Sequence, residues 1–75
     1  MSSEIKFLRQ KFIRLAIELH DIYNNIHIVF YPETKTVDVS FDAESHRHQI
    51  ACFYDGWDLD VLIKEYDKLI KFSDE

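Results

Sequence analysis

The stretch that decides the fold is TVDVSFD, residues 36–42, in which apolar and polar side chains alternate without interruption. Successive side chains of a β-strand point to opposite faces, so this alternation predicts a strand with one buried face and one solvent-facing face. The buried side would hold Val37, Val39 and Phe41, and the solvent-facing side would hold Thr36, Asp38, Ser40 and Asp42. We therefore expect a sheet that is covered on one face only.

Two further extended stretches flank this strand. IHIVFY (residues 26–31) and HRHQIACFY (residues 46–54) are rich in β-branched and aromatic residues, which favour strands. The polar links between them are PETK (residues 32–35), in which Pro32 fixes φ early in the turn, and AES (residues 43–45). Three short strands joined by such tight links predict an antiparallel meander.

Helical periodicity appears on both sides of the three strands. Apolar residues recur at three- and four-residue steps before residue 24 and after residue 58, which is the pattern of a helix with one buried face. The two stripes consist of Ile5, Leu8, Phe12, Leu15, Ala16, Leu19 and Tyr23, and of Leu59, Leu62, Ile63, Tyr66, Leu69 and Ile70. The predicted fold is α+β: a single αβββα domain over residues 1–75, in which both helices cover one face of a three-stranded antiparallel meander.

Composition narrows the class of protein. The 75 residues are 47% hydrophobic and 15% aromatic, which argues against disorder. A single cysteine cannot form an internal disulfide, and no apolar run approaches the roughly 20 residues of a membrane span. The N-terminal stretch becomes charged before an apolar signal region could form. We therefore expect a cytoplasmic protein that does not enter a membrane.

The stretch ESHRHQIACFYDGWD, residues 44–58, is the one place where catalytic or metal-binding chemistry could be sought. In an extended strand His46 and His48 lie about 7 Å apart and could share a zinc ion, but Cys52 lies about 13 Å further along. No second cluster at ligand spacing completes a metal site, and no glycine-rich loop accompanies the cysteine. We expect no metal, no cofactor and no catalytic residues, and hence a protein that is not an enzyme.

Apolar side chains on the uncovered sheet face form one candidate surface. The first strand would place Val29 and Tyr31 there, and the third strand would add Phe53, provided that Ile50 and Cys52 face the core. Aromatic side chains are enriched at the anchors of protein interfaces, and the tryptophan of the following loop would extend the patch. The candidate apolar partner-binding residues are Val29, Tyr31, Phe53 and Trp57. The alternative is that these are ordinary apolar residues at the rim of the sheet.

Acidic side chains form the second candidate surface. The first 14 residues carry a net charge of +3, whereas residues 15–75 carry −8, and residues 33–60 contain seven acidic and two basic residues. The candidate acidic partner-binding residues are Asp38, Asp42, Glu44, Asp55, Asp58 and Asp60. Carboxylates on a rigid sheet could imitate nucleic-acid phosphates and bind a basic protein, although an acidic surface is also ordinary for a solvated domain. Direct binding of nucleic acid is not expected, because the cations of the first helix do not form one stripe.

In size, charge and element order, the chain resembles very small acidic α/β proteins of phages and mobile elements, among them anti-CRISPR proteins and nuclease inhibitors. No residue motif carries this resemblance. It implies a small protein–protein interaction module that inhibits or regulates a nucleic-acid enzyme with a basic surface, through acidic-surface mimicry. The alternative is a structural subunit with no activity of its own, which forms a homodimer through the open faces of two sheets.

Overall fold

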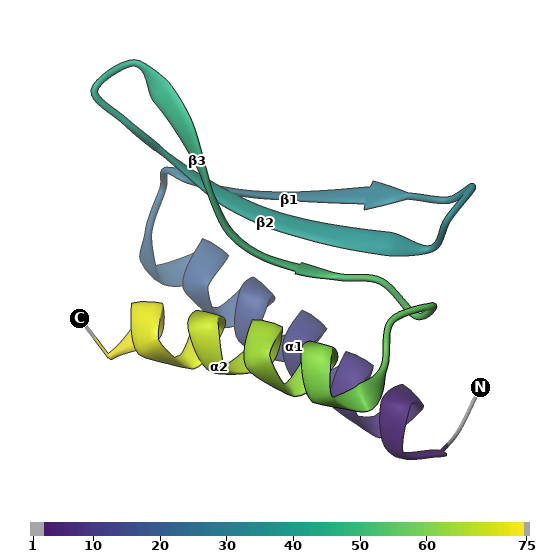
Figure 1. Ribbon diagram of the computed structural model, residues 1–75. Helices are drawn as coiled ribbons and strands as arrows, with labels where there is room; N and C mark the ends of the chain where they lie inside the picture. The colour runs from purple at the N-terminus through teal and green to yellow at the C-terminus, as the bar shows by residue number, and fades with distance from the viewer. Residues whose placement is uncertain (1–2, 75) are drawn as a thin grey trace.

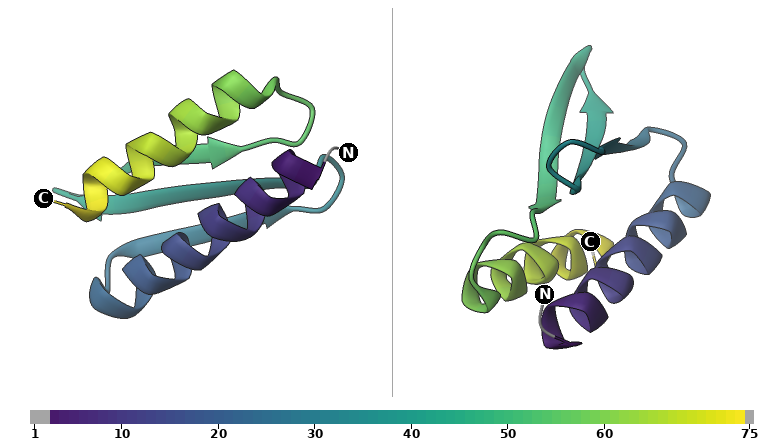
Figure 2. Two further views of the ribbon diagram at one scale, coloured as in Figure 1. Left: turned by 90° about the horizontal axis from the view of Figure 1, so that it is seen from below. Right: turned by 90° about the vertical axis from the view of Figure 1, so that its right-hand side faces the viewer.

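The computed structural model describes residues 3–74 and contains five elements. They are α1 (Ser3–Ile22), β1 (Ile26–Tyr31), β2 (Thr36–Ala43), β3 (His46–Phe53) and α2 (Leu59–Ser73). The strands form one antiparallel sheet in the order β1-β2-β3, which confirms the predicted α+β fold (Figure 1). Both helices lie on the same face of the sheet, side by side and running in the same direction (Figure 2).

The connection from α1 to β1 is fixed by Asn25. Its backbone carbonyl accepts the N–H of Asp42 at 3.0 Å, and its side-chain amide donates to the carbonyl of Asp42 at 2.8 Å. Both bonds join the end of the helix to the far end of β2, so the turn at Asn24–Asn25 starts β1 in register with its neighbour.

The core lies between the helices and the sheet. Its central contact is between the rings of Phe12 on α1 and Phe53 on β3, whose centroids lie 5.3 Å apart. The fully or almost fully buried apolar residues are Phe12, Ala16, Leu19, Ile26, Val37, Val39, Ala51, Phe53, Leu62 and Leu69. Each helix and each strand contributes to this set. The helical stripes and the alternation of β2 predicted their members of it, whereas Ala51 and Phe53 of β3 were not expected in the core. The other members of the predicted stripes are partly buried, except Ile63 on α2, which is 48% exposed.

The side chains of β3 are oriented differently from the sequence-based expectation. Val39 pairs with Ala51, but Phe41 pairs with His48, so β3 has one residue more than β2 between these two pairs. Such a β-bulge shifts the alternation by one position, and it lies between Val39 and Ser40 on the β2 side. Ala51 and Phe53 consequently face the core. The prediction that Phe53 lies on the uncovered face is wrong, because the side chain is completely buried.

The described residues, 3–74, contain no helix with the length and apolar character that a bilayer crossing demands.

Candidate functional site

The face of the sheet that points away from the helices is covered by no other element in residues 3–74 (Figures 1 and 2). We call it the open face; its polar members include His27, Asp38, Asp42, Arg47 and Gln49. Asp42 of β2 accepts hydrogen bonds from His27 Nε2 on β1 at 2.5 Å and from Arg47 Nε on β3 at 3.3 Å. Gln49 of β3 donates its amide to Asp38 of β2 at 2.6 Å. These bonds link polar side chains of all three strands across the open face.

This hydrogen-bond network lowers the pKa of the Asp42 carboxyl group. The hydrogen bond from His27 lowers the pKa of Asp42 below its ordinary value, partial burial opposes the shift, and Arg47 adds to the lowering. Asp42 is therefore a carboxylate whose charge is partly compensated by its neighbours. Asp38 accepts a hydrogen bond from the neutral amide of Gln49, and within residues 3–74 no cation is bonded to it, so it is the less compensated carboxylate of the open face.

The apolar candidates are only partly brought together. Val29 and Tyr31 lie on the open face of β1, as predicted; Val29 is half-buried and the Tyr31 residue is 47% exposed. Phe53 belongs to the core and contributes nothing to this surface. Trp57 lies in the loop between β3 and α2, where its ring contacts Tyr54 edge-on at 5.8 Å. Because β1 and β3 are opposite edges of the sheet, Tyr31 and Trp57 belong to separate margins.

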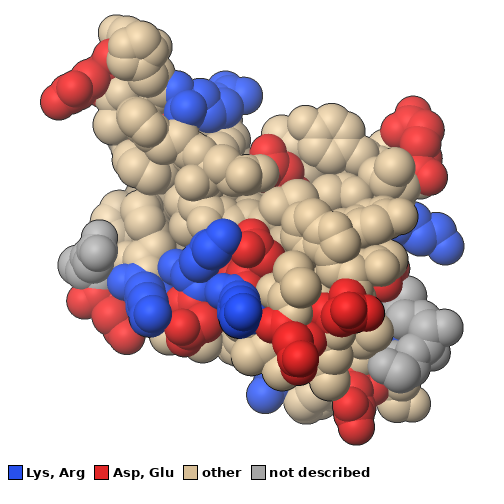
Figure 3. All heavy atoms as spheres, viewed as in Figure 1, with Lys and Arg blue, Asp and Glu red and all other residues tan. Residues whose placement is uncertain are grey.

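The acidic candidates do not form one patch. Glu44 lies at the tip of the β2–β3 hairpin, which projects from the body of the molecule, whereas Asp55, Asp58 and Asp60 lie at the other end of β3 (Figure 1). Of these, Asp55 is bonded to Arg9 of α1 at 3.2 Å. Along α2, acidic and basic side chains are interspersed toward the C-terminus, and acidic ones prevail near its start (Figure 3). The structure thus separates an acidic end near α2 from the open face.

The two histidines and the cysteine of β3 have different environments. His48 is exposed and stacks on Phe41 at 5.1 Å, and His46 lies at the start of the strand. Burial raises the pKa of the Cys52 thiol, and the charges of Asp38 and Glu65 raise it further, which makes the thiol a poor nucleophile. In the described part of the chain no three His, Cys, Asp or Glu side chains are grouped so that they could hold a metal ion.

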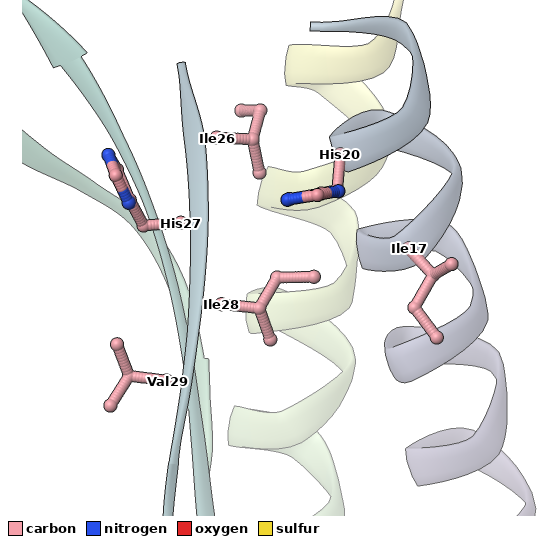
Figure 4. Close-up of a pocket in the computed structure, with 6 residues that line it drawn as sticks. All are labelled: Ile17, His20, Ile26, His27, Ile28 and Val29. Carbon is pink, nitrogen blue, oxygen red and sulfur yellow. The ribbon is translucent and has the colours of Figure 1, made fainter. Parts of the chain in front are cut away.

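A hollow between β1 and α1 was not foreseen from the sequence. It has a volume of about 320 Å³; Ile26 and Ile28 enter it from β1, and Ile17 and His20 border it from α1 (Figure 4). His27 and Val29 point to the other side of β1, toward the open face (Figure 4). The available signal was Ile17, an apolar residue at the margin of the helical stripe, which is 50% exposed. Periodicity alone could not show that this margin lies beside an edge strand.

Comparison of the chain with protein-family models, with curated proteins and with solved structures finds no match. The fold and the surface therefore define the class to which the chain can be assigned: a small αβββα domain with one covered and one open sheet face.

Proposed function

We propose that the protein is a non-enzymatic, cytoplasmic interaction module that binds another protein on the open face of its sheet. The observation that supports this most strongly is the composition of that face. Val29 and the exposed ring of Tyr31 lie on β1, and Asp38 lies on the neighbouring strand opposite Val29. An aromatic anchor beside fixed polar groups is the usual make-up of an interface core and its rim.

The charge of the chain indicates the kind of partner. The net charge is −5, and Asp38 keeps a carboxylate on the open face to which no cation of the described residues is bonded. A partner with a basic surface would be steered toward such a protein, and binding should weaken as salt is added. Inhibition of a nucleic-acid enzyme, of the kind found in phage anti-defence proteins, is the specific form of this function that we favour. Compensation of Asp42 by His27 and Arg47 argues that Asp38, rather than a continuous row of carboxylates, contributes most of the attraction.

Inhibition of DNA cleavage tests this proposal. The purified protein is titrated into plasmid cleavage by a CRISPR effector nuclease and by restriction endonucleases, at low and at high salt. For a nuclease that is inhibited, Asp38→Lys should raise the half-inhibitory concentration by about tenfold or more, since it places a cation against a basic partner. Tyr31→Ser should weaken inhibition by a similar factor at low and at high salt, because this substitution changes no charge.

Asp67→Lys is the matched control, because it makes the same charge change on an exposed position of α2, on the other side of the molecule. Inhibition that is lost equally in Asp38→Lys and Asp67→Lys would reflect net charge and would remove the open face from the proposal. No inhibition of any nuclease in the panel would remove the inhibitor form. A homodimer formed by two open faces is disfavoured by charge repulsion, because it would bring Asp38 and Asp42 of both copies together.

A further inference from the structure

The outer edge of β1 carries backbone groups that no other strand of residues 3–74 engages. In an antiparallel pair, alternate residues exchange both backbone hydrogen bonds with the partner strand. The N–H of Asp42 donates to the carbonyl of Asn25, so Asn25 belongs to the residues of this strand that bond to β2. Counting in steps of two from Asn25, the backbone groups of His27, Val29 and Tyr31 also bond to β2. The N–H and C=O groups of Ile26, Ile28 and Phe30 therefore point away from the sheet.

The two edge strands of the sheet, β1 and β3, differ in how they are protected from pairing with another chain. At the β3 edge, a bulge interrupts the pairing, and Glu65 of α2 accepts the backbone N–H of Cys52 at 3.0 Å. Bulges, charged residues and covering side chains are the means by which proteins prevent strand edges from pairing with other chains. β1 pairs with β2 over six residues without a register shift and contains no Lys, Arg, Asp, Glu or Pro. The β1 strand therefore has no bulge and no charged residue of its own, and the charged side chain that lies against it is Arg9 of α1, over the Phe30 ring.

The side chains of the same residues border an apolar depression. Ile26 and Ile28 enter the hollow beside α1, and Phe30 is half exposed at the end of the strand. The depression continues along the outer surface of α1, where a second hollow of about 390 Å³ lies. Its lining consists of Gln10, Ile13, Arg14, Ile17 and Glu18, so Ile17 borders both hollows. A strand added at the β1 edge would cover the outward backbone groups and the exposed parts of Ile17, Ile28 and Phe30, whereas Ile26 is already buried.

We propose that this strand is β1 of a second copy of the chain, paired antiparallel about a two-fold axis at Ile28. In this register Ile28 meets Ile28 of the second copy and Ile26 meets Phe30, so all three residues with outward backbone groups meet their counterparts. No other antiparallel register of β1 with itself uses all three. The product is a continuous six-stranded sheet with the four helices on one face, because the axis is perpendicular to the sheet.

Charge complementarity on α1 favours a second copy over a foreign strand. The axis reverses the direction of the second α1, so the two helices meet antiparallel along the surface that Ile17 shares with Arg14 and Glu18. Arg14 and Glu18 lie one helical turn apart on that surface, and an antiparallel arrangement centred midway between them, one residue before Ile17, places Arg14 of one copy beside Glu18 of the other. β1 brings no formal charge into the pairing. The contact is therefore apolar at its centre and flanked by opposite charges.

The first test is the solution mass from light scattering over a hundredfold range of protein concentration. The unmodified chain should reach the mass of a dimer, and Ile17→Lys should raise the dissociation constant by about tenfold or more, because two added cations meet across the axis. Ile63→Lys is the matched control, since Ile63 on α2 is 48% exposed and Ile17 is 50% exposed. It should leave the dissociation constant unchanged. A charge swap adds specificity: Arg14→Glu should weaken the dimer, and Arg14→Glu with Glu18→Arg should restore it.

The second test reads the register directly through amide hydrogen exchange measured by NMR. The amides of Ile28 and Phe30 should exchange rapidly at low concentration and become protected as the dimer forms, whereas those of Val29 and Tyr31 should be protected throughout. A monomer at all concentrations would overturn the proposal and leave the edge to a foreign strand. A dimer in which the Ile28 and Phe30 amides still exchange rapidly would overturn it as well. The proposal is independent of partner binding on the open face, because neither test involves that face.

Discussion

Asp42 is a residue of the open face whose pKa is shifted by its neighbours. His27 and Arg47 both donate to its carboxylate, and together they hold its pKa below the ordinary value of 3.8. In the unfolded chain this compensation is absent, so the ionised form of Asp42 stabilises the folded state above pH 3.8. That contribution is lost as the pH falls toward the lowered pKa of the folded protein.

Replacing Asp42 with Asn should therefore flatten the acid side of the stability profile. We expect the free energy of unfolding of the unmodified chain to fall more steeply below pH 3.8 than that of Asp42→Asn, because only the former gains a proton at this site on unfolding. Urea denaturation across a pH series from neutrality to well below 3.8 measures the difference. Glu33→Gln in the exposed β1–β2 turn is the control for removing a carboxylate. Equal slopes in the unmodified chain and Asp42→Asn would contradict the prediction.

The position of Asp42 was predictable, but its partners were not. Uninterrupted alternation in residues 36–42 is sufficient to place its side chain opposite the core. His27 and Arg47 reach it only because β1 and β3 pair with β2 in particular registers, and one of these registers contains a bulge. The sequence therefore indicated a free carboxylate for partner binding where the structure has a partly compensated one.

At the scale of the elements, local periodicity was sufficient for the order α-β-β-β-α, since both helical stripes and the central strand are unambiguous. It failed for β3, where the stretch HRHQIACFY is apolar on both faces toward its end and offers no alternation to count. Ile50 and Cys52 fit a core-facing parity as well as Ala51 and Phe53 do. Only the bulge, a property of two paired strands, decides between them.

The β3 edge depends on one side chain of α2. Glu65 accepts the N–H of Cys52 with Oε1 at 3.0 Å and binds Lys68 Nζ with Oε2 at 2.5 Å. Glu65→Ala should lower the free energy of unfolding by about 1–3 kcal/mol, because the Cys52 N–H loses its acceptor in a partly buried place. Glu65→Gln keeps a carbonyl oxygen at this position and should retain most of the stability. Urea denaturation of the two variants compares them, and equal losses would show that the hydrogen bond to Cys52 does not contribute.

At the scale of the whole molecule, Arg9 joins segments that are far apart in the chain. Its guanidinium bonds Asp55, 46 residues away in the β3–α2 loop, at 3.2 Å, and its Cζ lies 5.8 Å from the centre of the Phe30 ring on β1. The side chains of Arg9 and Asp55 are only 20% and 15% exposed. The sequence suggested that Asp55 binds a partner, because nothing local indicates that the first helix and this loop meet. The Asp55 carboxylate is therefore bonded to Arg9 within the fold.

The pair between Arg9 and Asp55 should accordingly be coupled in a double-mutant cycle. Asp55→Ala and Arg9→Ala should each cost about 1.5–3 kcal/mol, because either change leaves a mostly buried charge without its partner. The double variant should cost less than the sum of the two, by about 0.5–3 kcal/mol, since no unpaired charge remains. Lys71 and Asp67 on α2 provide the matched control: this pair is also 3.2 Å apart, but its side chains are 75% and 55% exposed, so its coupling should stay near 0.3–0.5 kcal/mol. Urea denaturation of all six single and double variants measures both couplings. Additive costs for Arg9 and Asp55 would mean that the packing of the helices onto the sheet, and not this ion pair, holds the first helix against the loop that starts the last.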